Sequence, residues 1–282
     1  MTHSYLNLSR QGNNSLGHYL VGTLLIFFFW FFLGGIFASI IIISFKQLTF
    51  IHKYLLSKLP DIFFCLGIFL AVGCVHQRKL TTLFGAKGSV KIKKLLLGFG
   101  IWSSLSAIFL IISFFISPQK YSFTFDADQW LVFLPFALVF TPIQVLSEEL
   151  LFRGYLLQGL SQLTRKPLVL IILNSFLFAV PHFSTSEMQR GAVWMFLYYF
   201  VWGVFLTAIT LKDNRIELAL GIHTAANLYG VLFVQATDST ITTPTIWKVA
   251  PNNPKYSIAL ILVLMTMCYF ALFFGRTARG NY

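Results

Sequence analysis

Charged side chains are scarce in this chain of 282 residues, where Asp, Glu, Lys and Arg together make up 11%. A soluble domain carries about a quarter of its residues as charges. Hydrophobic residues account for 57%, and the mean hydropathy is +0.76. These values exclude a soluble globular domain and predict an integral membrane protein. The apolar runs are long and continuous, whereas membrane β-strands alternate in short segments, so we expect an all-α, polytopic helical bundle.

Acidic residues are scarcer than basic ones, nine against 21, which gives a net charge of +12. In a soluble protein this excess would suggest a nucleic-acid partner. Here the basic residues lie in the loops between apolar runs, where positive charge sets the topology of a membrane protein. No basic segment is interleaved with aromatic residues as in modules that bind nucleic acid. We therefore expect the lipid bilayer, and no nucleic acid, as a partner.

Cysteine is also rare, with Cys65, Cys74 and Cys268 all in apolar segments. Their spacing fits neither a metal site nor a disulfide framework, and we interpret them as small buried hydrophobes. The apolar run that follows the polar N-terminal stretch is too long for the core of a signal peptide, which predicts a retained first span.

Hydropathy predicts eight membrane spans, because a span needs about 20 mostly apolar residues. The second and fifth are weak: the second contains Lys58, Pro60 and Asp61, and the fifth is short. A seven-span alternative therefore stays open. The predicted spans are 19–45, 54–75, 95–117, 129–156, 168–182, 191–211, 216–234 and 256–275.

With eight spans, the basic loops 76–94, 157–167 and 212–215 fall on one side, together with Arg276 and Arg279. The positive-inside rule places this side, and both termini, in the cytoplasm. Three lysines, at positions 46, 53 and 58, fall on the opposite side, which suggests that part of 46–60 is an interfacial helix.

No internal repeat or long linker divides the chain, so we expect one membrane domain. Its parts are a polar N-terminal tail (1–18), N-terminal transmembrane helices (19–128), a core of helices carrying the polar motifs (129–234), and a loop with the last transmembrane helix (235–282). The first three spans are expected to carry almost no polar chemistry within the membrane.

Three polar motifs interrupt the apolar segments of the core: EELLFR over 148–153, FAVPH over 178–182 and HTAAN over 223–227. An ionisable group at membrane depth costs roughly 2.5–3.5 kcal/mol, so such groups pair with one another or perform chemistry. Residues four apart share one face of a helix. The pairs so spaced are Glu149 with Arg153, Phe178 with His182, and His223 with Asn227; Asn174 precedes Phe178 by one turn on the same face.

A carboxylate and an imidazole in a low-dielectric cavity can hold and deprotonate a water molecule. A second histidine with an asparagine supplies donors for a developing oxyanion. This equipment suits hydrolysis of an amide bond without a covalent nucleophile. Glu148, His182 and His223 would equally form a zinc site with an open position for water. The sequence does not choose between no cofactor and a single divalent metal.

The three motifs, in this order on successive helices, resemble those of the CAAX proteases and bacteriocin-processing enzymes. This family of intramembrane endopeptidases includes the Ras-converting CAAX prenyl proteases. The resemblance covers about 148–227, and Gly154 also fits its pattern.

The resemblance implies that Glu148 activates water together with His182, and that His223 and Asn227 stabilise the oxyanion. It implies that Glu149 and Arg153 pair and hold this helix in place. Phe178 would wall the cavity, whereas Asn174 would either support the site or link two helices. The substrate implied is a lipidated or membrane-associated protein or peptide.

Two other classes of function compete with a protease. A non-catalytic membrane protein could serve peptide immunity or regulate a partner by binding, although the intact set of motif residues argues against it. A proton-coupled transporter could use the two glutamates and His182 as a relay, but such proteins often carry inverted repeats, and none is visible here.

Overall fold

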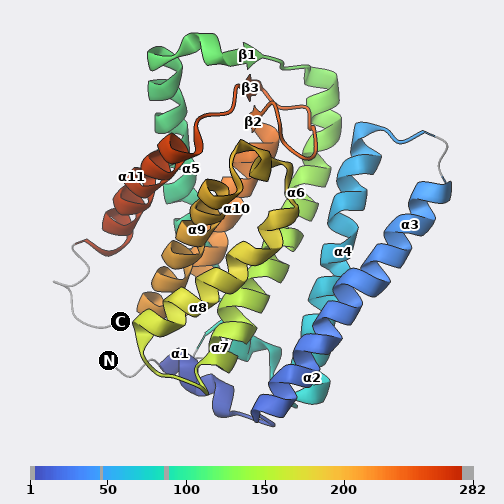
Figure 1. The fold of residues 1–282 in the computed structure, drawn as a ribbon, viewed down its shortest axis with the longest axis vertical. Coiled ribbons are helices and arrows are strands. Elements are labelled where there is room, and N and C mark those ends of the chain that lie inside the picture. Colours follow the sequence, from blue (N-terminus) through green and yellow to red (C-terminus); the bar gives the residue numbers. More distant parts are fainter. Residues whose placement is uncertain (1–3, 45–46, 86–88, 275–282) are drawn as a thin grey trace.

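The computed structural model describes residues 4–44, 47–85 and 89–274, and these fold into a bundle of long helices (Figure 1). Seven helical segments in this part of the chain are long and apolar enough to cross a membrane. An eighth helix, α10, has 16 residues and carries the third motif. The all-α polytopic prediction is therefore confirmed.

The N-terminal half begins with two short helical turns and then contributes three long helical segments, two of which include a stretch of π-helix. Its elements are α1 (Ser4–Asn7), η1 (Leu8–Arg10), α2 (Leu16–Phe27), the π-helix η2 (Phe28–Leu33), α3 (Gly34–Ser44), α4 (Phe50–Leu70), the π-helix η3 (Ala71–Val75), η4 (Leu80–Leu83), α5 (Ile92–Ile116), η5 (Pro118–Lys120) and β1 (Tyr121–Phe123).

The C-terminal half contains the helices that carry the three motifs and ends with α11. Its elements are α6 (Ala127–Glu149), the π-helix η6 (Leu150–Leu156), α7 (Leu157–Leu160), α8 (Pro167–Ala179), η7 (Val180–Ser184), η8 (Ser186–Arg190), α9 (Ala192–Asp213), α10 (Glu217–Leu232), β2 (Val234–Ala236), β3 (Trp247–Val249) and α11 (Pro254–Phe273).

Local sequence signals explain where several of these helices begin and end. Asp126 caps α6 by accepting a hydrogen bond from the backbone N–H of Gln129 at 3.1 Å, and Pro167 stands in the first turn of α8. The helix α9 ends at Asn214, whose φ of 55° lies in the left-handed region that asparagine tolerates. Local sequence therefore sets the starts of α6 and α8 and the end of α9.

The weak second span is a continuous helix from Phe50 through Val75, although it contains Pro60. Lys53 and Lys58 both lie on it, so the interfacial helix that we expected within 46–60 is wrong for the described residues 50–60. Lys46 lies outside the described residues, as do Arg276 and Arg279. The Tyr54 hydroxyl and the Thr141 Oγ1 atom, 2.6 Å apart, connect α4 to α6.

The segment expected as a polar tail contributes to the core over Ser4–Arg10. Tyr5 and Leu6 are buried there. The Tyr5 hydroxyl lies 2.6 Å from the carbonyl oxygen of Leu83 and 2.9 Å from that of Arg153. The segment Ser4–Arg10 is therefore attached to the middle of the π-helix η6 (Leu150–Leu156), at the last residue of the first motif.

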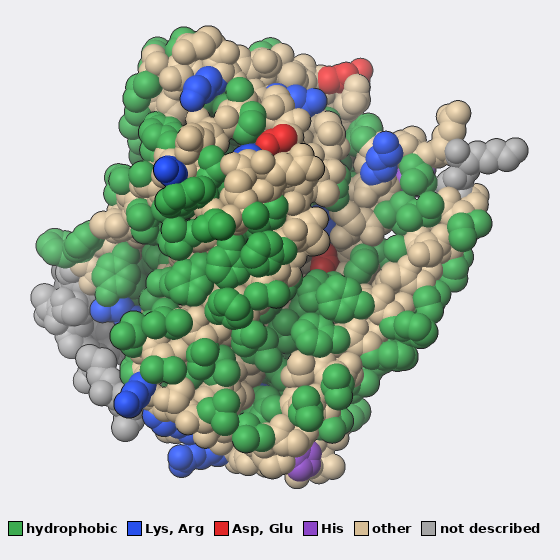
Figure 2. Space-filling view, viewed as in Figure 1, with side chains coloured by type: hydrophobic (Ala, Val, Ile, Leu, Met, Phe, Trp, Pro, Cys, Tyr) green, Lys and Arg blue, Asp and Glu red, His purple; other side chains and the backbone are tan. Residues whose placement is uncertain are grey.

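Three short strands close one end of the bundle, in the order β1–β3–β2 (Figure 1). β1 pairs with β3 antiparallel, with Tyr121 opposite Val249, and β2 pairs with β3 in parallel. Nearby, Arg190 pairs with Asp238 and joins η8 to the loop after β2, and its guanidinium lowers the pKa of the Asp238 carboxyl. Figure 2 shows hydrophobic side chains over the middle of one face, with basic side chains gathered toward its two ends.

Glycine lets α10 approach α5 closely enough to place the third motif. A Cβ atom on Gly221 would lie 2.0 Å from the carbonyl oxygen of Leu95, and one on Gly98 would lie 2.5 Å from that of Leu218. Neither space can hold a methyl group unless the two backbones separate. His223 follows Gly221 by two residues, so the position of its ring depends on this contact.

We predict that Gly221→Ala destabilises the folded protein by about 1–3 kcal/mol, the usual range for overpacking a filled site. Gly100→Ala is the matched control, because a Cβ there meets nothing within 4 Å. In a helix the control substitution should be neutral or slightly stabilising. Unfolding of both variants in mild detergent measures the difference, and equal stability would contradict the close packing.

Candidate active site

The first motif lies where α6 changes from α-helix to π-helix. Glu148 and Glu149 end the α-helical part, and Arg153 stands within η6. π-helical turns occur frequently at functional sites because they redirect side chains locally. Both Glu149 and Arg153 are fully buried, and Arg153 Nη1 donates to Glu149 Oε1 at 2.8 Å. The pair expected from their spacing is present.

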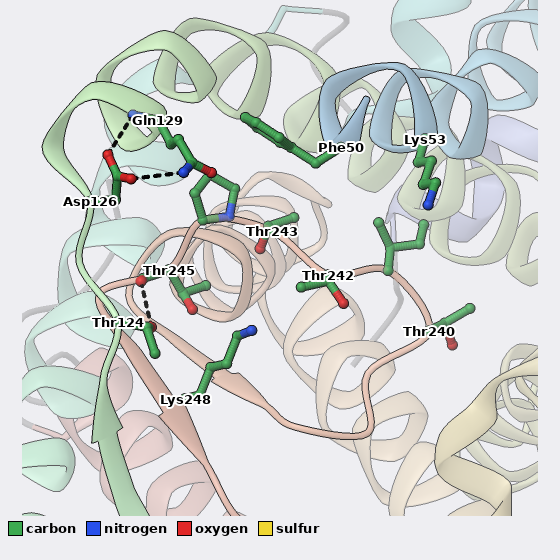
Figure 3. Close-up of a pocket in the computed structure, with 12 residues that line it drawn as sticks. Phe50, Lys53, Thr124, Asp126, Gln129, Thr240, Thr242, Thr243, Thr245 and Lys248 are labelled. Carbon is green, nitrogen blue, oxygen red and sulfur yellow. Dashed lines mark hydrogen bonds between the residues drawn. The ribbon is translucent and has the colours of Figure 1, made fainter. Parts of the chain in front are cut away.

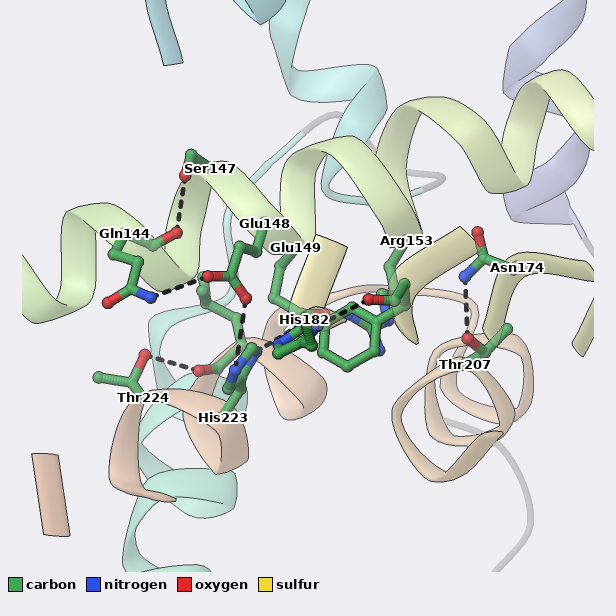
Figure 4. Close-up of polar contacts among 12 residues, drawn as sticks. Gln144, Ser147, Glu148, Glu149, Arg153, Asn174, His182, Thr207, His223 and Thr224 are labelled. Carbon is green, nitrogen blue, oxygen red and sulfur yellow. Dashed lines mark hydrogen bonds and ion pairs between the residues drawn. The ribbon is translucent and has the colours of Figure 1, made fainter. Parts of the chain in front are cut away.

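Glu149 also contacts the third motif, which the spacing did not predict. His223 Nδ1 lies 2.8 Å from the same Glu149 Oε1 atom (Figure 4). An ionised carboxylate only accepts hydrogen bonds, so Nδ1 carries a proton here. One buried carboxylate oxygen therefore bridges a guanidinium on η6 and an imidazole on α10, and it fixes which nitrogen of His223 faces away.

That outward nitrogen of His223 faces Glu148. His223 Nε2 lies 3.6 Å from Glu148 Oε2, which is too far for a good direct hydrogen bond and near enough for a shared water molecule. Glu148 is less buried than its neighbour, since 15% of its side chain is exposed. Gln144 Nε2 donates to Glu148 Oε1 at 3.0 Å, from one turn earlier on α6. Glu148 is thus held on one side and accessible on the other.

His182 approaches from the turn η7 that follows α8. Its Nδ1 lies 2.9 Å from the carbonyl oxygen of Phe178. Because a carbonyl can only accept, Nδ1 carries the proton and Nε2 keeps a free lone pair. The ring stacks on Tyr199 of α9, with centroids 4.0 Å apart. The helix α8, which leads to His182, crosses the bundle obliquely in Figure 1.

Phe178 lies between the guanidinium and the two histidines. Its ring is 4.2 Å from Arg153 Cζ, a cation–π distance, and its centroid is 4.9 Å from that of His182 and 6.0 Å from that of His223. Only 2% of this residue is exposed. It therefore packs on the Arg153 guanidinium and beside both histidine rings.

The two asparagines have different surroundings. Asn227 lies one turn after His223 on α10 and is half-buried, and no hydrogen bond ties its amide to another described residue. Asn174 is fully buried and donates to Thr207 Oγ1 of α9 at 2.9 Å (Figure 4). Asn174 therefore links α8 to α9, whereas the Asn227 amide remains available.

Four polar or aromatic neighbours of the motifs were not predicted from the sequence. Lys58 Nζ on α4 donates to Gln144 Oε1, so the second span reaches the site, and Asp61 lies one turn further along α4. The expectation that the first three spans carry almost no polar chemistry is wrong. Ionisable residues within a span were the available signal for Lys58 and Asp61, and the four-residue spacing from Glu148 was the signal for Gln144. No pattern in the sequence indicated that Tyr199 would lie beside the motifs.

The residues do not fit a metal ion. Within 4–44, 47–85 and 89–274, no group of three or more His, Cys, Asp or Glu side chains is arranged to hold one. The Glu148, His182 and His223 set, which the sequence left open as a zinc site, is therefore not supported by the geometry.

Two cavities are not lined by the ionisable residues of the three motifs. One of about 490 Å³ is bordered by the starts of α4 and α6 and by the threonine-rich loop 240–245 (Figure 3). Another, of about 470 Å³, is apolar and lies among α5, α6 and α10, where Ala225 and Leu228 line it. The second follows the helix of His223 and suits an apolar group.

Comparison with known proteins agrees with the site. The family model described as type II CAAX prenyl endopeptidase Rce1-like matches residues 128–229, which include all three motifs. The chain is 32% identical over 229 residues to the uncharacterized protein YyaK of Bacillus subtilis (strain 168), an alignment that covers 80% of this chain and 77% of YyaK. No solved structure matches the chain significantly. The resemblance inferred from the motifs is thereby confirmed: this protein belongs to the Rce1-like family of CAAX-type intramembrane proteases.

Proposed function

We propose that this protein is an intramembrane endopeptidase that hydrolyses a peptide bond in a membrane-associated or lipidated substrate, with water activated by Glu148. The observation that carries the proposal is the convergence of the three motifs: Glu148 faces His223, and His223 is held from behind by Glu149. Membership of the family supports a protease at the level of the whole chain.

In the proposed mechanism Glu148 is the general base and His182 helps to hold the water. Glu148 is partly accessible, and one of its oxygens is fixed by Gln144. The Nδ1–H of His182 donates a hydrogen bond to the Phe178 carbonyl oxygen, so Nε2 is free to accept a hydrogen bond from water. A base and a second acceptor orient the water for attack on a carbonyl carbon.

His223 and Asn227 would stabilise the oxyanion that forms. In this role both ring nitrogens of His223 carry protons: Nδ1–H donates to Glu149, and Nε2–H donates to the oxyanion. The Asn227 amide, one turn further along α10, supplies a second donor. Two donors fixed before the reaction stabilise developing charge without having to reorganise.

In this mechanism Glu148 first accepts a proton and then returns it. Water loses one proton to Glu148 as its oxygen bonds to the carbonyl carbon, and the carbonyl oxygen becomes the oxyanion. The C–N bond then breaks as the oxyanion collapses, and Glu148 returns its proton to the departing amine. The products are a carboxylic acid and an amine, and no covalent enzyme intermediate forms.

We place the end of the bundle where α5, α8 and α10 begin in the cytoplasm, since this end carries the basic loops. His223 lies six residues from the start of α10, or about 9 Å along the helix axis, so the site would be reached from that side. A lipidated or membrane-associated chain end can enter there while its apolar part stays in the bilayer. A non-catalytic binding role and proton-coupled transport are the outcomes left if no cleavage occurs.

We predict that Glu148→Gln lowers kcat by about 10²–10⁴-fold, the usual contribution of a general base. The substitution keeps the shape of the side chain and its contact with Gln144 but removes the basic oxygen. Purified protein in detergent should be tested on a quenched CAAX-type peptide and on a pool of small membrane peptides. Asp128→Asn, an exposed acidic residue in the first turn of α6, is the control. Unimpaired cleavage by Glu148→Gln, or no cleavage by wild type, would contradict the proposal.

We predict that Asn227→Ala lowers kcat by about 10²–10³-fold with little change in KM, because an oxyanion donor acts mainly in the transition state. Asn174→Ala is the matched control: it breaks the bond between α8 and α9, so it should lower thermal stability while the folded fraction keeps its kcat. An effect of Asn227→Ala on KM alone would instead assign this residue to substrate binding.

A further inference from the structure

The polar cavity beside the loop 240–245 is lined by none of the residues proposed for hydrolysis (Figure 3). Its volume of about 490 Å³ lies within the range of sites that hold small ligands. Lys53 of α4 and Lys248 of β3 line it, and Figure 3 shows both ammonium groups pointing toward the loop. Among the described residues, neither ammonium forms an ion pair or a hydrogen bond. Two cations therefore border one cavity, and neither is paired with an anion.

The loop 240–245 is fixed to β2 by a buried glutamine. Gln235 Nε2 donates to the carbonyl oxygen of Ile241 at 2.9 Å, and Gln235 Oε1 accepts from the backbone N–H of Thr243 at 3.0 Å. The Thr243 hydroxyl donates to the carbonyl oxygen of Val231 at 2.9 Å. Contacts within the chain therefore hold this wall of the cavity in place.

One buried hydroxyl of this loop lacks a partner. Thr245 lines the cavity and is only 1% exposed, yet its Oγ1 atom has no hydrogen-bond partner among the described residues. Buried polar groups in folded proteins are nearly always hydrogen-bonded. The backbone of Thr245 is already engaged, since its carbonyl oxygen accepts from the Thr124 hydroxyl at 3.0 Å. The free hydroxyl therefore supplies a donor to the cavity, in addition to the two ammonium groups.

The carboxylate that lines the cavity is occupied elsewhere. Asp126 Oδ1 accepts from the backbone N–H of Gln129 at 3.1 Å, and its Oδ2 accepts from the Gln129 side-chain amide at 2.7 Å. Asp126 thereby caps α6 and forms no ion pair with either lysine of the cavity. Two lysines against one aspartate leave an excess of positive charge, so the cavity favours an anionic ligand.

The position of the cavity and its donors indicate the kind of anion. Two candidate membrane spans begin at its border, one at Phe50 and one at Ala127. The ends of spans lie at the level of the lipid headgroups, where phosphate groups are abundant. A phosphoryl group carries three strong acceptor oxygens, and these can accept from donors on different elements. It therefore suits a cavity whose donors come from α4, β3 and the loop.

We propose that this cavity binds a phosphoryl group, with Lys248 and Thr245 as hydrogen-bond donors and Lys53 as a further positive charge. The group belongs either to the headgroup of a membrane lipid or to a soluble phosphate. Its binding would join α4 to the loop 240–245 and to β3 at the end of the bundle opposite the basic loops. This second site is independent of the proposed function, because no residue of the proposed hydrolysis lines it.

The test measures binding of three probes to the purified full-length protein in an uncharged detergent, by native mass spectrometry. The probes are a short-chain phosphatidylglycerol, a diacylglycerol with the same chains, and inorganic phosphate. Wild type should bind the phosphatidylglycerol at least about 10-fold more tightly than the diacylglycerol, as expected for a hydrogen bond to a charged group. Binding of the lipid alone would assign a lipid headgroup, whereas binding of inorganic phosphate would assign a soluble source. Equal binding of the two lipids, with no binding of inorganic phosphate, would overturn the proposal.

Three variants locate the site. Lys248→Met and Thr245→Val should each weaken binding of the phosphorylated probe by about 10-fold. Lys255→Met is the matched control: Lys255 is an exposed lysine in the first turn of α11, shortly after β3, and it does not line the cavity. Its loss should leave binding unchanged. Equal losses in Lys255→Met and Lys248→Met would overturn the proposal, because the attraction would then come from the overall charge of this end. Thr245→Val keeps the volume of the side chain, so unchanged binding by this variant would also overturn the proposal, even if Lys248→Met does not fold.

Discussion

The site depends on one buried carboxylate oxygen. Glu149 Oε1 accepts from Arg153 and from His223, and it thereby joins the helix of the first motif to the helix of the third. Three ionisable groups meet at full or nearly full burial, where each alone would be expensive. Because these groups are stabilised only when they contact one another, α10 is held in one position against the π-helix η6. That position sets which face of His223 meets Glu148.

Close backbone packing supplies the second constraint. Gly221 and Gly98 allow α10 and α5 to approach until a methyl group no longer fits, and Gly203 does the same for α9 against Ser175 of α8. In lipid, such close contact is a principal source of helix association, since burial of apolar surface gives little advantage there. The glycines place the helices, and the ion pairs then orient the side chains on them. A loosened helix contact would consequently affect the chemistry even far from the reacting groups.

The sequence predicted most of the architecture and the local part of the site. Hydropathy found the long helices, and four-residue spacing correctly predicted that Glu149 pairs with Arg153 and that Phe178 lies beside His182. Contacts between distant segments have no such periodic signal. The bond from Glu149 to His223, the link from Asn174 to Thr207 and the stacking of Tyr199 on His182 all depend on how helices pack. The expected position of Lys58 was wrong for the same reason. Its charge made the second span look weak in the sequence, and only the packing of α4 against α6 shows that Lys58 contacts Gln144.

The most direct measurement is a double-mutant cycle on the Glu149–Arg153 pair, scored by chemical unfolding in mild detergent. Arg153→Met alone leaves a buried carboxylate with less compensation and should destabilise the protein by about 3–5 kcal/mol. Combining it with Glu149→Gln should cost clearly less than the sum of the two single changes, with a coupling of about 0.5–3 kcal/mol. Additive effects within error would show that the two residues do not act as a pair, and would contradict the account of how His223 is held.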